Sequence, residues 1–190
     1  MAFFKFFDNR RPDFSGPALG LYRAAVAAAR APAFYARFGV PDTPDGRFDM
    51  IALHVFLALR RLQREQGPTR QDAQALAQAL TDLMFADMDR NLREMGVGDL
   101  GVGRQVKALA AAFRGRVAAY GAALDRSDDE EGLALAVKRN IFRLDGDAAG
   151  QITSRIAQHI RNADAALAAQ PWPALAAGTI DFPPPFERPD

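Results

Sequence analysis

The chain has 190 residues, of which 24 are basic, 23 are acidic and none is cysteine, and this length fits one domain with a sizeable core. The net charge of +1 argues against a dedicated nucleic-acid-binding protein. The lack of cysteine excludes a disulfide framework, a thiolate zinc site and a cysteine nucleophile. No apolar run approaches the roughly 18 residues of a membrane-spanning helix.

The first segment, residues 1–16, is predicted to be an N-terminal arm that mixes aromatic and cationic side chains. It is too short and too interrupted for a signal peptide. Aromatic side chains beside cations suit the surface of a membrane, and the alternative is an arm that packs its phenylalanines on the domain. The candidate membrane contacts are Phe3, Phe4, Lys5, Phe6, Phe7, Arg10 and Arg11.

Residues 17–169 have helical periodicity almost throughout. Helices are expected at about 17–30, 48–65, 69–95, 103–124, 127–144 and 151–169, because glycines and prolines separate these periodic segments. The segment 48–65 is apolar on both sides, which is typical of a central helix. Residues 170–190 are proline-rich and are expected to form a tail that is extended or mobile. The predicted fold is a single all-α bundle of about six helices, with an arm and a tail.

The helix expected at 69–95 carries polar residues within its apolar face. At about 100° per residue, Asp87, Asn91 and Glu94 fall inside the stripe formed by Leu80, Met84 and other apolar residues. A buried carboxylate is costly unless it is paired or hydrogen-bonded. We therefore expect that these residues meet partners from other helices, or that this face is not fully buried.

A metal-dependent or small-molecule enzyme would use His54 with the carboxylates of Asp87 and Glu94. Di-iron helical bundles, however, require Glu-x-x-His motifs, and the sequence contains none. No Gly-x-Ser-x-Gly elbow indicates a hydrolase. The alternatives are a buried polar network in which Asp87 or Glu94 meets an arginine or His54, and a plain helical scaffold. No metal ion or cofactor is predicted.

The glycine-dense segment 96–103 contains a Gly-x-Gly sequence. It follows a predicted helix and lacks the Gly-Lys-Ser/Thr ending of a phosphate-binding loop, so the pattern favours a helix end at Gly96 and a turn. Just before it, Phe85, Asp89, Arg90 and Arg93 are expected to project away from the apolar stripe. This side of the helix is either a solvated face or, with an exposed Phe85 beside Asp89 and Arg93, a protein contact.

Three runs along the chain resemble the ubiquinol–cytochrome c chaperone family. They are Arg30-Ala-Pro-Ala-Phe-Tyr, the segment 40–54, and Asp87-Met-Asp-Arg-Asn-Leu-Arg-Glu-Met-Gly-Val-Gly-Asp. The resemblance extends over about residues 21–124. The residues that match the two longer motifs, and thus the candidate client-binding residues together with Phe85, are Asp42, Thr43, Gly46, Arg47, Phe48, His54, Asp87, Asp89, Asn91, Arg93, Glu94, Gly96, Gly98 and Asp99.

This resemblance implies an all-helical, non-enzymatic assembly factor that binds cytochrome b during maturation of the ubiquinol–cytochrome c reductase, respiratory complex III. It brings no catalytic residue, and it implies a small partner protein or the ribosome as further partners. The start of the chain lacks a transit-peptide pattern, so a bacterial, cytoplasmic member with peripheral contact to the inner membrane is expected. The client would enter a groove edged by residues 39–49 and 85–99.

Overall fold

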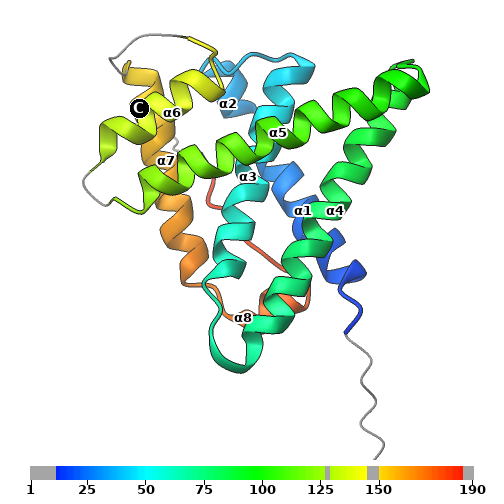
Figure 1. The fold of residues 1–190 in the computed structure, drawn as a ribbon. Helices are drawn as coiled ribbons and strands as arrows, with labels where there is room; N and C mark the ends of the chain where they lie inside the picture. Colours follow the sequence, from blue (N-terminus) through cyan, green and yellow to red (C-terminus); the bar gives the residue numbers. More distant parts are fainter. Residues whose placement is uncertain (1–11, 127–128, 145–149, 186–190) are drawn as a thin grey trace, which may run out of the picture.

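The computed structural model describes residues 12–126, 129–144 and 150–185, and the regular structure of these residues is entirely helical, which confirms the predicted all-α class (Figure 1). The elements are α1 (Ser15–Ala29), α2 (Pro32–Ala36), α3 (Pro44–Gln63), the 3-10 turn η1 (Gly67–Thr69), α4 (Arg70–Glu94), α5 (Asp99–Leu124), α6 (Glu130–Asn140), α7 (Gln151–Ala168) and α8 (Trp172–Ala176).

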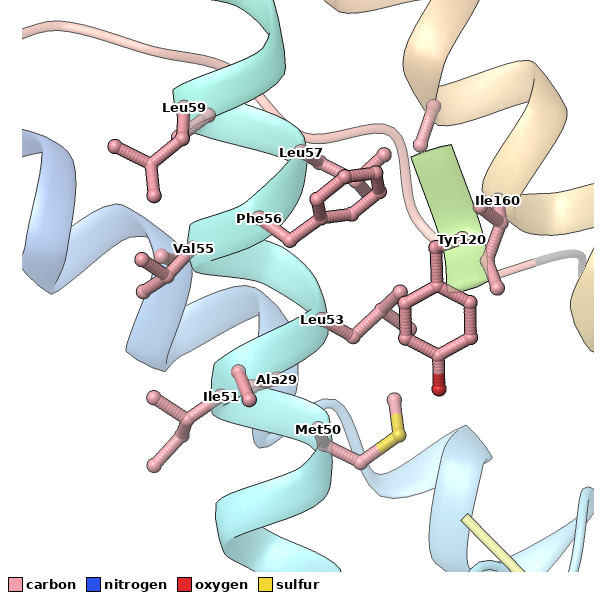
Figure 2. Packing of buried hydrophobic residues seen from close by; sticks show 14 of the residues in the cluster. Ala29, Met50, Ile51, Leu53, Val55, Phe56, Leu57, Leu59, Tyr120 and Ile160 are labelled. Carbon is pink, nitrogen blue, oxygen red and sulfur yellow. The ribbon is translucent and has the colours of Figure 1, made fainter. Parts of the chain in front are cut away.

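Helix α3 lies at the centre of the fold, as its two-sided apolar pattern predicts. Every residue from Phe48 to Leu59 is buried, and α3 contacts α1, α4, α5 and α7. Figure 2 shows Leu53 and Phe56 pointing toward Tyr120 of α5 and Ile160 of α7, while Val55 points to the opposite side. Because one helix supplies core side chains in all directions, the other helices pack around it.

Helices α4 and α5 are the longest elements and are joined by the short turn 95–98. Gly96 has a left-handed backbone with φ of 82°, and its N–H donates to the carbonyl of Arg93 over 3.0 Å. Such a glycine ends a helix without steric cost. The next helix begins at Asp99, four residues earlier than predicted, because the glycines at 101 and 103 are incorporated into its first turns.

The segment after α7 folds back onto the core, whereas the sequence predicts a tail that is extended or mobile from residue 170. Leu175 and Ile180 are buried, and the red end of the chain passes behind α3 (Figure 1). The side chain of Gln170 exchanges two hydrogen bonds, of 2.6 and 3.0 Å, with the backbone of Asp181. The apolar side chains of this proline-rich segment therefore pack against the core, with α8 contacting α1 and Phe182 contacting His54 of α3.

The approach of this segment to α1 depends on glycine. A Cβ atom at Gly20 would lie 2.2 Å from the carbonyl oxygen of Gly178. Gly178 itself has a left-handed φ of 83°. None of the helices in the described ranges combines the length and the hydropathy that a membrane span requires.

Candidate functional site

A groove with a volume of about 870 Å³ lies between the start of α3, the C-terminal part of α4 and the middle of α5. Its apolar lining comes from all three helices: Phe48, Ile51, Met88, Leu92, Met95 and Leu109. Its polar lining includes Arg30, Asp42, Thr43, Asp45, Arg47, Asn91, Glu94, Gln105, Arg116 and Arg143. Two sequence motifs that are about 45 residues apart thus meet at one surface.

The first motif forms the entry into α3. The hydroxyl of Thr43 accepts a hydrogen bond of 3.1 Å from the backbone N–H of Gly46 and so caps the helix. A Cβ atom at Gly46 would lie 2.0 Å from the carbonyl oxygen of Pro41, which explains why glycine follows Pro44-Asp45 here. On the exposed side, Arg47 donates to Asp42 over 2.7 Å, and this hydrogen bond lowers the pKa of the Asp42 carboxyl.

A buried charge cluster connects α3 with α5 and with the end of α6. Asp49 is fully buried and forms ion pairs with Arg116 and, over 3.2 Å, with Arg143. Arg143 also lies 3.5 Å from Asp45, and Arg116 lies 5.5 Å above the ring of Phe48. Burial raises the pKa of Asp49 to about 6, although both arginines act in the opposite direction. The cluster therefore fixes the position of the groove floor.

Asp49, Arg116 and Arg143 are not among the site residues that the sequence predicts. Asp49 carries the only formal charge between Phe48 and Leu59, and this isolation within an apolar helix was a usable signal. Arg116 follows Phe113 by three residues and precedes Tyr120 by four, so it also falls on the apolar stripe of its helix. No signal in the sequence indicates Arg143, because only the path of the chain after α6 brings it to α3.

For Asp87, Asn91 and Glu94 the sequence predicts either partners from other helices or a face of α4 that is not fully buried. The structure shows both, because Asp87 meets Tyr22 of α1 whereas Asn91 and Glu94 are exposed. The buried residues of this helix are Ala73, Leu76, Leu80, Met84, Met88 and Leu92. Asp87 lies at the edge, and Asn91 and Glu94 are exposed. Met95, which directly follows α4, is 60% exposed. The reason is that the groove, and no packed helix, faces this last part of α4.

Asp87 connects α4 to α1. Its carboxylate accepts a hydrogen bond of 2.8 Å from the hydroxyl of Tyr22 and one of 3.2 Å from the amide of Asn91, and it pairs with Arg90. Burial and the nearby carboxylate raise the pKa of Tyr22 well above its usual value. Asp87 therefore meets an arginine, as the polar-network alternative predicts. The contact lies at the edge of the core instead of within it, since Arg90 is exposed and belongs to the same helix.

The other residues of the second motif build the turn between α4 and α5. Arg93 forms ion pairs with Asp89 over 2.7 Å and with Asp99 over 2.5 Å. Both carboxylates raise the pKa of Arg93. Gly98 precedes α5 as its N-cap residue. The sequence predicts that Phe85 projects away from the apolar stripe. In the structure its ring instead packs edge-on against Phe113, with the centroids 6.0 Å apart.

His54 is buried away from the groove. Its Nδ1 lies 2.8 Å from the carbonyl oxygen of Met50, and its ring packs edge-on against Phe34 and Phe182. Burial lowers its pKa to about 4, so the imidazole is neutral at pH 7. Asp87 instead contacts Tyr22, Asn91 and Arg90, and Glu94 is exposed, so the structure does not bring these carboxylates together with the buried His54.

Within the described ranges, no group of three or more His, Asp or Glu side chains is arranged to hold a metal ion. The candidate membrane contacts Phe3, Phe4, Lys5, Phe6, Phe7, Arg10 and Arg11 lie outside the described residues.

Comparison with known proteins identifies relatives that share this region. A family model described as "Ubiquinol-cytochrome C chaperone" matches residues 36–182, a range that includes most of the groove. The ubiquinol-cytochrome c reductase complex assembly factor 1 of Drosophila melanogaster is 26% identical over 142 residues, which are 74% of this chain and 54% of the fly protein. The chain thus spans about half the length of that relative.

A solved structure also has the same fold. The crystal structure of the Cbp3 homolog from Brucella abortus superposes with a TM-score of 0.75 and 42% sequence identity. The match covers 88% of this chain and 90% of that one.

Proposed function

The chain belongs to the ubiquinol–cytochrome c chaperone family, and we propose that it is a non-enzymatic chaperone that binds cytochrome b during assembly of the ubiquinol–cytochrome c reductase. One observation carries the proposal for the site: the motifs at 40–54 and 87–99 line a single groove that combines an apolar wall with charged rims. The client would occupy this groove reversibly until its cofactors and partner subunits arrive.

The lining of the groove suits an apolar segment of variable shape. Met88 and Met95 contribute unbranched, polarisable side chains, which adapt to different partners. An amphipathic helix that lays its apolar side into a groove is a common mode of recognition by helical domains. Its polar side would then meet Arg47, Asn91 and Glu94 at the rims.

The location and further partners follow from the same proposal. A chaperone for cytochrome b acts where that protein enters the membrane, so we place this chain in the cytoplasm with peripheral contact to the inner membrane. The N-terminal arm, with Phe3 to Phe7 beside Lys5, Arg10 and Arg11, would supply this contact. A small assembly protein or the ribosome is the further partner that the family resemblance implies.

The test uses a groove residue whose replacement does not disturb the core. Met95 is 60% exposed and lines the groove, whereas Ile152 of α7 is 46% exposed and lies outside it. Met95→Glu should reduce capture of cytochrome b by about tenfold, because it introduces a charge into the apolar contact. Ile152→Glu, the matched control, should leave capture unchanged. Capture is measured by crosslinking in native membranes, affinity purification and mass spectrometry.

Two outcomes would contradict the proposal. If the unaltered chain, taken from cells that are making the reductase, brings down no cytochrome b, the client is wrong. If both variants bring down as much cytochrome b as the unaltered chain, the client is right and the groove is not its binding site.

A further inference from the structure

The outer face of α5 carries cations, and the single carboxylate of this helix is Asp99 in its first turn, which pairs with Arg93. Between Leu100 and Leu124 there are four cations and no Asp or Glu. Arg116 points inward to Asp49, and the other three, Arg104, Lys107 and Arg114, are exposed. Figure 1 shows α5 crossing in front of α3, so this face lies at the surface of the molecule.

These three cations lack partners among the residues that the structure describes. None of them forms a hydrogen bond or ion pair within residues 12–126, 129–144 and 150–185. The arginines at the end of α3 differ: Arg60 and Arg64 pair with Asp164, and Arg61 pairs with Glu65. Since no described residue pairs with Arg104, Lys107 or Arg114, each of them can take an anionic partner from another protein.

The surface between the cations is made of small residues. At about 100° per residue, the exposed positions share one side of the helix, opposite Val102, Phe113 and Tyr120. A Cβ atom at Gly115 would meet no atom within 4 Å, so packing inside the chain does not require a glycine in the middle of this helix. The small exposed residues are Ala108, Ala111, Gly115, Ala118 and Ala122.

The shape of this face favours a helix as its occupant. Small side chains let a second helix approach to about 8 Å between the axes. The 26 residues of α5 extend over about 39 Å, long enough to pair with a helix of several turns. A helix that binds a membrane surface uses large apolar or aromatic side chains. Among the positions of α5 whose exposure the structure describes, none of the exposed ones carries such a side chain.

We propose that the outer face of α5, defined by Arg104, Lys107, Ala111, Arg114 and Ala118, binds an acidic α-helix of a partner protein. The carboxylates of that helix would pair with the three cations, and its small or polar residues would lie over Ala111 and Ala118. Gln105 and Ala108 also line the client groove, so the bound helix would run along the rim of the groove. The proposal does not depend on the identity of the client.

The experiment places a photocrosslinking amino acid, p-benzoylphenylalanine, at Ala111 of the full chain in living cells. The control position is Gln158, which is exposed on α7. The expected adduct at position 111 is a protein segment that is helical and rich in Asp and Glu. Arg104→Gln, Lys107→Gln and Arg114→Gln together should lower the yield of this adduct by about tenfold, because three charge pairs are lost. All three side chains are exposed, so the fold should persist.

Charge exchange then decides between true pairing and simple proximity. Changing the three cations to Glu should abolish the adduct, and changing the carboxylates of the crosslinked segment to Lys should restore it. The proposal is overturned by adducts to lipid or RNA alone, by no adduct specific to position 111, or by an adduct that survives in the triple variant. Capture of cytochrome b by the triple Gln variant should stay unchanged, so this failure is distinguishable from failure of the client proposal.

Discussion

Asp49 is buried among apolar residues in the central helix, and its ion pairs explain how the start of α3 is tied to α5. Removing a charge from water is expensive, and a buried pair compensates for this cost only while both partners are present. Arg116 and Arg143 supply the compensating charges from two different parts of the chain. These two ion pairs of Asp49 thus fix which side of α3 is turned toward the groove.

Arg116→Met should lower the free energy of unfolding by about 3–5 kcal/mol. The reason is that the buried carboxylate of Asp49 then keeps only Arg143, which is partly exposed, as its ion-pair partner. Asp49→Leu combined with Arg116→Met should recover much of this loss, since neither charge is then buried alone. Urea denaturation at pH 7 measures both. Strictly additive effects of the two substitutions would show that the pair is not coupled.

The two buried histidines predict a loss of stability in mild acid. Burial lowers the pKa of His54 and of His159 to about 4, so the unfolded chain binds protons below pH 6.5 that the folded chain does not. Stability is therefore full above pH 6.5 and falls as the pH decreases toward 4, by roughly 3 kcal/mol for each histidine. Asp49 has its pKa raised to about 6, so between pH 6 and pH 4 the folded chain binds a proton there that the unfolded chain does not. This proton stabilises the fold as the pH falls and offsets part of the loss.

Urea midpoints between pH 4.5 and pH 7 test this dependence. His54→Gln should reduce the change with pH by about half, because His159 retains its share. An unaltered pH profile in His54→Gln would mean that His54 does not titrate differently in the folded and unfolded states.

At the scale of elements, periodicity predicts where helices form but not what covers each face. The apolar stripes of α3 and α4 are visible in the sequence, and both helices form. The polar residues Asp87, Asn91 and Glu94 within the stripe of α4 indicate a face that is not fully buried. They do not indicate which helices form the other walls of the groove, because this depends on where α3 and α5 lie. Likewise, Asp49 and Arg116 are 67 residues apart, and only the crossing of two helices brings them together. Spacing along the chain cannot supply that crossing.

The contact between α1 and the C-terminal segment should be sensitive to a single methyl group. Gly20→Ala places a Cβ atom 2.2 Å from the backbone of Gly178 and should destabilise the fold by about 1–3 kcal/mol. Gly16→Ala, in the same helix, meets no atom within 4 Å and should be neutral or stabilising by up to about 1 kcal/mol. Thermal unfolding compares them. Equal midpoints for the two variants would contradict the close packing of this segment.

At the scale of the whole molecule, the burial of α3 on all sides predicts the order of hydrogen exchange. Amides of residues 48–59 should exchange only through global unfolding, since every helix packed on α3 must separate first. Amides of the exposed turn 95–98 should exchange through local opening. Exchange followed by mass spectrometry would contradict this fold if the peptides from α3 were labelled before those from α6.

The groove is assembled from residues between Arg30 and Arg143, and this dispersion has a consequence for biosynthesis. A chain that is still being translated cannot present the finished surface until α5 and the residues after α6 have left the ribosome. Until then the methionines and Phe48 are exposed without their neighbours. The protein that is proposed to shelter an unfinished membrane subunit must itself be translated beyond Arg143 before it can bind its first client.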